Sequence, residues 1–345
     1  MGRERDDAVA LKKEPKLQLA NGKVPKLVPQ SSEKPIVYLS HSIVHTRELE
    51  TEFLDCTGVR YRCCSFVYIH PDMIYWTPRA WEGYKVNVER GNHIMMDSGA
   101  FSFQMFLFKH KELQNVDVLR EKTINAYIEF CHKRAKSWDF YVTFDYIRDV
   151  ELVWKMTKRM EKEGLNPAPV YHGDQSLDWM KRYLDAGYKR IGISPLLGVR
   201  SSHKALRFYL DNLFKLVDGY KDVKLHGFAM TSLSTMFAYP WHSVDSSSWS
   251  RTSSYGCIYT VDVGKNTMGT CHVSLEAARN PNSYSTLAKE AQVAIRQQVE
   301  RRGFDFDLLR KSVTYRHIFN GWLFSHLNQF KKQIQNTHVR FQSLL

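Results

Sequence analysis

The sequence predicts an α/β protein in which eight parallel strands alternate with helices, a (β/α)8 TIM barrel. Three observations support this prediction: eight short apolar runs, helical patterns between several of them, and polar residues at the ends of six runs. Strands that alternate with helices imply right-handed crossovers and a parallel sheet, which can close when it has eight strands. A doubly wound open sheet is the alternative, but no Gly-x-Gly-x-x-Gly follows an early strand.

Residues 1–34 come before the first apolar run and are rich in Lys, Pro, Gln and Ser, with little periodicity. We expect a flexible basic tail that contacts a phosphate backbone, and a tail without function is the alternative. The first residues alternate in charge and lack the apolar core of a signal peptide. No run approaches the roughly 18 apolar residues of a membrane span. We therefore expect a soluble cytoplasmic protein with no membrane partner.

The catalytic barrel is expected over residues 35–285. Its strands should lie in the eight apolar runs, which are Ile36–Ser40, Ser65–Ile69, Ile94–Asp97, Phe140–Asp145, Ala168–Tyr171, Arg190–Ser194, Lys224–Phe228 and Trp241–Asp245. Helical patterns fill four of the intervening segments, which are Val118–Ser137, Val150–Gly164, Ser176–Gly187 and His203–Gly219. The last two patterns end in Gly, a usual helix stop signal.

Residues 286–345 have a different character and should form a basic helical C-terminal extension. The patterns of Leu287–Arg302 and Leu308–Gln335 predict amphipathic helices. From Thr286 onward the chain contains ten Lys or Arg and only four Asp or Glu. Interleaved aromatic residues have the helical spacing of a core face. The basic residues on the opposite face are candidates for a nucleic-acid groove.

Composition supports a folded, basic, reduced protein. The chain has 345 residues, 43% of them hydrophobic, and a formal net charge of +13 with a pI near 9.3. This excludes a disordered chain and suits a polyanionic partner such as DNA. None of the six cysteines has Cys-x-x-Cys spacing, so disulfides and a compact zinc site are not expected. A zinc site at Cys257, Cys271 and His272 is the alternative, although their spacing fits no compact zinc template.

The polar residues at strand ends define the candidate site. In a barrel the carboxyl ends of all strands meet at one face, which is where catalytic groups lie. The residues that end the runs are Asp97, Asp145, His172-Gly173, Ser194-Pro195, His226-Gly227 and Asp245. Three carboxylates and two imidazoles would thus converge on one opening.

Two facing carboxylates suit glycosidic chemistry. In this interpretation Asp245 is the nucleophile that forms a sugar ester, and Asp97 is the general acid and later the base. Ile94, Met95 and Phe101 are expected to form an apolar wall that raises the pKa of Asp97. Phe101 is also a candidate stacking face for a purine, and Asp145 a candidate acceptor for a guanine-like edge. Structural roles for Asp145, His172 and His226 are the alternative.

The same residues resemble the tRNA-guanine transglycosylase superfamily, most of all its DNA 7-deazaguanine transglycosylase branch, which occurs in phages and bacteria. Asp97-Ser98-Gly99-Ala100-Phe101-Ser102 resembles the family's Asp-Ser-Gly-Gly-Phe-Gln, and Thr143-Phe144-Asp145 resembles its Phe-Asp segment. Tyr171-His172-Gly173 falls where the family has Val-Gln-Gly, and Ile193-Ser194-Pro195-Leu196 where it has Ile-Gly-Gly-Leu. His226-Gly227 is similar to the family's Met-Gly turn, and Asp245 to its nucleophile.

The resemblance implies catalytic roles for Asp97 and Asp245. It implies a base-binding site of Ser98, Phe101, Asp145, His172, Gly173, Ser194, Pro195, His226 and Gly227. The family's Cys-x-Cys-x-x-Cys zinc segment is absent after Asp245, so no metal or other cofactor is expected. Ala100, Ser102, His172, Ser194 and Pro195 differ from the tRNA enzymes at base-contacting positions, which favours DNA over tRNA as the partner.

The resemblance therefore predicts a pentosyltransferase that replaces guanine in DNA with a 7-deazaguanine base, such as 7-cyano-7-deazaguanine, through a covalent Asp–deoxyribose intermediate. It would act in the cytoplasm of a bacterium or a phage-infected host cell. The same exchange on tRNA, and a non-catalytic nucleic-acid-binding subunit with the same barrel, are the alternatives. The sequence does not define which 7-deazaguanine is used, the DNA context, the oligomeric state or the need for a partner protein.

Overall fold

The computed structural model describes residues 30–40, 47–147, 149–173, 175–194, 202–262, 267–275 and 283–331. The expected N-terminal tail lies almost wholly outside these residues. The boundaries drawn after residues 34 and 285 stay predictions.

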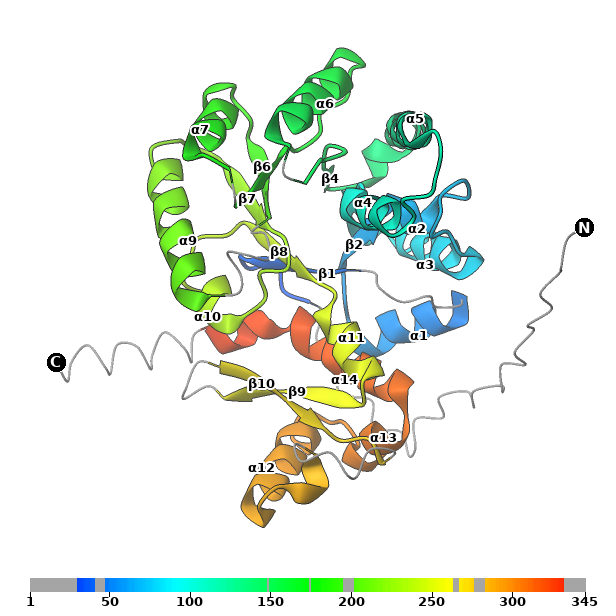
Figure 1. Ribbon diagram of the computed structural model, residues 1–345. Helices are drawn as coiled ribbons and strands as arrows, with labels where there is room; N and C mark the ends of the chain where they lie inside the picture. The colour runs from blue at the N-terminus through cyan, green and yellow to red at the C-terminus, as the bar shows by residue number, and fades with distance from the viewer. Residues whose placement is uncertain are drawn as a thin grey trace, which may run out of the picture.

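The fold is α/β, with helices alternating with the strands of a curled eight-stranded parallel sheet (Figure 1). The sheet order is β4-β3-β2-β1-β8-β7-β6-β5. The strands are β1 (Ile36–Ser40), β2 (Tyr61–Ser65), β3 (His93–Asp97), β4 (Phe140–Tyr141), β5 (Val170–His172), β6 (Arg190–Ser194), β7 (Lys224–Gly227) and β8 (Ser243–Ser246). An isolated parallel bridge between Val142 and Ala168 links the segments that carry the two edge strands. This arrangement is consistent with a TIM-like barrel.

Most strands lie where the sequence predicts them, and β1 and β6 match the predicted residues. The second strand is the exception. The run Ser65–Ile69 was expected to be a strand, but its apolar residues form the short helix α2 (Phe66–Ile69) and the strand precedes it. A continuous apolar run of four residues has no periodicity that separates a strand from a helix, which explains the wrong assignment.

Helices follow the strands in turn. They are α1 (Arg47–Thr57), α3 (Pro78–Glu89), α4 (Ala100–Lys109), α5 (Val116–Arg134) with η2 (Ala135–Ser137), α6 (Val150–Lys162), α7 (Leu177–Asp185), α9 (His203–Val217), α10 (Leu233–Met236) and α11 (Ser248–Ser254). The four predicted helical segments correspond to α5 with η2, α6, α7 and α9. Side chains of Thr77, Asp149, Ser176 and Ser202 accept hydrogen bonds from the first-turn amides and so fix four helix starts.

Beyond α11 the chain forms a hairpin that was not predicted, β9 (Cys257–Asp262) and β10 (Thr267–His272). It continues through η4 (Tyr284–Thr286), α12 (Lys289–Glu300), α13 (Phe306–Lys311), α14 (Val313–Ser325) and η5 (Leu327–Phe330). The predicted single helix from Leu308 is divided at Ser312, whose side chain caps α14. Helix α14 lies between the curled sheet and the hairpin (Figure 1), and its aromatic residues are buried there.

Three apolar clusters hold these layers together. One consists only of residues on or beside the strands, such as Tyr38, Cys63, Met95 and Val142, and therefore lies inside the curl of the sheet. The other two contain helix residues together with the alternate strand residues and lie outside it. Because Met95 points inward, Asp97 two residues later belongs to the inner face as well. In the described part of the chain no helix has the length and apolar character needed to cross a membrane.

Candidate active site

The candidate residues gather at the carboxyl ends of the parallel strands. Asp97 ends β3, His172 ends β5, Gly227 ends β7, and Asp245 lies one residue before the end of β8. The register places Ser65 beside Asp97, and His172 beside Ser194. Since all eight strands are parallel, these groups share one edge of the sheet, as expected for catalytic groups of such folds.

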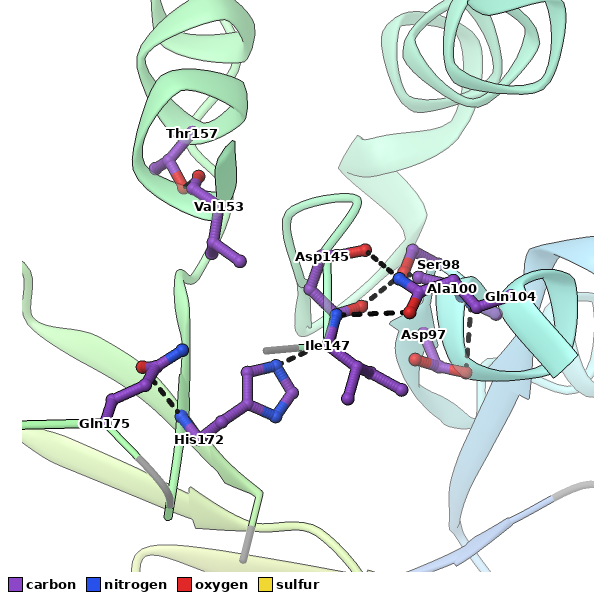
Figure 2. A network of polar contacts seen from close by, with 11 residues as sticks. Asp97, Ser98, Ala100, Gln104, Asp145, Ile147, Val153, Thr157, His172 and Gln175 are labelled. Atoms are coloured by element: carbon purple, nitrogen blue, oxygen red, sulfur yellow. Dashed lines mark hydrogen bonds and ion pairs between the residues drawn. The ribbon is translucent and has the colours of Figure 1, made fainter. Parts of the chain in front are cut away.

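Asp145 connects two sides of the site (Figure 2). Its Oδ1 accepts a hydrogen bond of 3.4 Å from the hydroxyl of Ser98, and its Oδ2 lies 3.1 Å from Nε2 of His172. Gln104 on α4 donates to the carbonyl oxygen of Asp145 at 3.3 Å and accepts from the amide of Ile147. The loop after β4 is thereby fixed to α4, and the Asp145 carboxylate lies between β3 and β5.

His172 is buried and approaches the site from β5. Its backbone amide donates to the side-chain oxygen of Gln175 at 3.1 Å. Neither ring nitrogen makes a hydrogen bond of good geometry to the described residues, although Nε2 is close to Asp145. A buried imidazole with unused hydrogen-bonding capacity beside a carboxylate is suited to a polar ligand.

The turn after Asp97 requires glycine. Gly99 has a left-handed φ of 76°, and its amide donates to Oδ2 of Asp97 at 3.2 Å. A Cβ at this position would lie 2.4 Å from Cγ2 of Val67, so any other residue is excluded by contact as well as by conformation. The turn starts α4 and holds the carboxylate at the mouth of the sheet.

Burial and, after it, the negative charges of Asp145 and Asp245 together raise the pKa of Asp97 to about 7. The direction agrees with the sequence-based expectation, but the expected apolar wall is only partly correct. Ile94 packs in the outer cluster against helices, and Phe101 is 58% exposed on α4, which leaves Met95 as the inward apolar residue. The repulsion by neighbouring carboxylates was not anticipated.

Asp245 has different surroundings. Ser40 donates its hydroxyl to Oδ2, and the amide of Ala229, which has a φ of 55°, donates to Oδ1 at 2.9 Å. Nε2 of His226 lies 3.5 Å from Oδ1. These donors fix the orientation of the carboxylate.

His226 lies inside the sheet below Asp245. It is fully buried, its Nδ1 lies 2.9 Å from the hydroxyl of Ser243, and its ring contacts those of Tyr38 and Phe140. Because the His226 ring has no exposed surface, it is better placed to contact Asp245 than to contact a bound base. The geometry therefore favours a positioning role for His226.

The remaining candidates are distributed around the same edge. Gly173 donates its amide to the carbonyl of Ser194 at 3.1 Å, and Ser194 ends β6. A Cβ on Gly227 would lie 2.9 Å from Met230, so this glycine allows close packing. Phe101 is exposed on the surface of α4. Pro195 lies outside the described residues.

Sequence reasoning missed several residues that support the acids. Ser40 ends a correctly predicted strand, so the strand-end rule applied to every strand would have found it. Cys63 pairs with Ser40 on one side and Met95 on the other, and burial and then the charges of Asp245 and Asp97 raise the pKa of its thiol. It was missed because the second strand was placed too late. Gln104 and Gln175 carry no sequence signal of their roles.

The candidate zinc ligands lie on the hairpin, away from the strand ends. His272 pairs with Cys257 across β9 and β10, and Cys271 pairs with Ile258. Among the described residues, no group of three or more His, Cys, Asp or Glu is placed to hold a metal ion.

No protein-family model matches this chain, and no curated protein shows significant similarity to it. Function is therefore inferred from the site. It contains one acid with a pKa near neutrality, a second acid held by hydrogen-bond donors, and a third acid paired with an imidazole. Such a set can donate a proton, attack an electrophilic carbon and bind a polar heterocycle.

Proposed function

We propose that this protein exchanges guanine in DNA for a 7-deazaguanine base through a covalent intermediate on Asp245. The observation that carries the proposal is the different environment of two acids at one edge of the sheet. Asp97 has a pKa near 7, raised by burial and by neighbouring acids, whereas Asp245 is oriented by Ser40 and Ala229. Pairs of acids in contrasting environments divide the roles of proton donor and nucleophile.

In the first step an oxygen of Asp245 attacks C1′ of the deoxyribose. The bond between C1′ and N9 of guanine breaks, its electron pair goes to the base, and the base takes the proton of Asp97. In the second step N9 of the incoming 7-deazaguanine attacks C1′ and loses its proton to Asp97, and the bond to Asp245 breaks. Both acids return to their starting states, so no further reactant is needed.

The neighbouring polar residues supply recognition. The carboxylate of Asp145 accepts from N–H groups of a guanine-like edge, and His172 offers a further polar contact from the opposite side of the site. Gly173 and Ser194 line the adjoining strand ends, and we place the base between them and Asp97. Guanine and 7-deazaguanine present similar edges, so one site serves both.

The proposal includes a closed (β/α)8 barrel, for which the Val142–Ala168 bridge is the supporting contact. It also includes a basic C-terminal extension that contacts the DNA backbone. Arg301 and Arg302 line a cavity of about 550 Å³ together with Trp322 and Phe330. Cations beside aromatic rings suit a nucleic-acid backbone.

The direct test is incubation of the purified protein with DNA and a radiolabelled 7-deazaguanine base. Label should enter DNA with the wild type and not with Asp245→Asn. Asp139→Asn, which changes a carboxylate at the opposite end of the strands, is the matched control and should incorporate label. Label that enters tRNA in preference to DNA would indicate the tRNA reaction. Binding of nucleic acid without any incorporation would indicate a non-catalytic subunit.

A further inference from the structure

Helix α4 exposes an apolar stripe to solvent. Phe101 is 58% exposed, Met105 is 38% exposed and Phe108 is 64% exposed. Their spacing of four and three residues places the three side chains on one face of the helix. A contiguous exposed stripe of this kind commonly marks a binding surface.

Two other side chains of α4, one opposite the stripe and one beside it, belong to the site already described. Phe103 is buried against Phe144, and Gln104 holds the loop that carries Asp145. The helix is therefore held in place by Phe103 and Gln104, and the exposed stripe is not needed to attach it to the fold.

The stripe is continuous with the site. Helix α4 begins at Ala100, directly after the turn that holds Asp97. From Phe101 to Phe108 the helix advances about 10 Å. A polymer whose reacting unit is beside Asp97 thus has a path along the outer face of α4.

The charge of the surface identifies the class of polymer. Helix α4 contains no Asp or Glu, and Lys109 is exposed at its end. The turn that follows exposes Lys111 and one acid, Glu112, which lies 3.1 Å from Nδ1 of His110. The ammonium group of Lys111 lies 4.7 Å from the centre of the Phe108 ring. Exposed rings combined with cations are the usual means of holding unpaired bases and their phosphates.

We propose that this surface, the α4 track (Phe101, Met105, Phe108, Lys109 and Lys111), binds the single-stranded DNA that flanks the target nucleotide. Flanking bases stack on Phe108 and contact Met105, and their phosphates lie near the two lysines. This inference rests on the proposed function and adds to it that the substrate is unpaired DNA. Unpaired DNA also lowers the cost of bringing the target base out of the stack.

The test measures the affinity of the full chain for a short fluorescein-labelled single-stranded oligonucleotide with one central guanine, by fluorescence anisotropy. Phe108→Ala should weaken binding by about fivefold to a hundredfold, the range found when one stacking ring is removed. Phe108→Trp should bind at least as tightly as the wild type. Phe208→Ala is the matched control, because Phe208 is 72% exposed on α9, away from the α4 track, and this variant should bind like the wild type.

Equal affinity of Phe108→Ala and the wild type would overturn the inference. A preference of the wild type for duplex over single-stranded DNA would also overturn it. So would a dimer that Phe108→Ala dissociates with no change in DNA affinity, because the stripe would then be a contact between two copies. Base exchange by the wild type separates the two claims. If the wild type exchanges bases and Phe108→Ala binds DNA like the wild type, the proposed function stands and the α4 track is wrong. If Phe108→Ala weakens DNA binding but the wild type exchanges no base, the α4 track stands and the proposed function is wrong.

Discussion

The two ends of the sheet both carry aspartates, but these aspartates have different neighbours. At the amino ends of the strands, Asp139 accepts a hydrogen bond of 2.6 Å from the hydroxyl of Tyr38 and lies 2.9 Å from Nδ1 of His93. At the carboxyl ends, Asp97 lies within the electrostatic influence of two other carboxylates, and its pKa is raised to about 7. Both ends supply hydrogen-bond donors to their acids, but Asp97 is also repelled by Asp145 and Asp245.

This difference separates a structural role from a chemical one. A carboxylate that has polar partners and no acidic neighbour contributes to stability, whereas repulsion between neighbouring acids reduces stability and shifts their pKa values toward those useful in catalysis. A cavity of about 840 Å³ lies at the amino ends, away from the crowded acids, and is lined by Asp139 and Arg190. Concavity alone therefore does not identify the active site, and the surroundings of the acids do.

The largest expected effect is the loss of base exchange in Asp245→Asn. Removing the nucleophile should lower the rate at least about 10³-fold, because the amide does not form the sugar ester. Asp139→Asn at the other end should stay within about threefold of the wild type, since its side chain is far from the reacting bond. Steady-state incorporation of labelled base measures both. Equal losses in the two variants would remove the distinction between the ends.

Asp97→Asn should slow guanine release by about 10²- to 10⁴-fold, the usual contribution of a general acid. In the wild type the rate of this step should fall as the pH rises above about 7, because Asp97 then loses the proton that the departing base needs. The pH dependence should flatten in Asp97→Asn. Single-turnover release of labelled guanine between pH 5 and 9 measures it, and an unchanged profile in the variant would assign the proton to another group.

The same substitution should stabilise the fold. The folded-state pKa of Asp97 is raised from 3.8 to about 7, so between these values the folded chain binds more protons than the unfolded chain. The contribution of Asp97 to the unfolding free energy therefore falls as the pH rises through this window. At pH 8, Asp97→Asn should gain about 1–3 kcal/mol, with a smaller gain at pH 5. Urea unfolding at both values checks this, and a destabilised variant at pH 8 would contradict the crowding of acids.

Asp139→Asn should have the smallest effect and the opposite sign. It weakens the contacts with Tyr38 and His93, which should cost about 1 kcal/mol of unfolding free energy. Thermal unfolding at neutral pH is the measurement. A stabilised Asp139→Asn would show that the acid at this end is also strained, and that the two ends do not differ in the way described.

Much of the fold could be predicted because apolar runs that end in polar residues have a clear pattern. The run Ile36–Ser40 and the run Arg190–Ser194 are strands over the predicted residues. The strand predicted at Ser65–Ile69 was wrong because the apolar residues of this run form a short helix, and a continuous apolar run has no alternation of apolar and polar residues to tell the two apart. The hairpin of β9 and β10 carries too little apolar alternation to be recognised, since much of its surface is exposed or half-buried.

The sequence predicts which residues lie at the strand ends, but it does not predict which groups form hydrogen bonds with them. The position of Asp97 and Asp245 at one edge follows from parallel strands. The donation from Ala229 to Asp245 depends on a left-handed backbone at a non-glycine residue, which the sequence does not reveal. His226 is a similar case, because only packing shows that its ring lies below Asp245 and not at the opening.

The central claim is that Asp245 becomes covalently attached to deoxyribose while Asp97 transfers the proton. The most direct measurement is the mass of the intact protein after incubation with a single-stranded oligonucleotide containing guanine and no incoming base, followed by peptide mapping. We predict a protein–DNA adduct on the peptide that contains Asp245, formed by the wild type and absent in Asp245→Asn. An adduct on another residue, or its formation by Asp245→Asn at the wild-type rate, would contradict the claim.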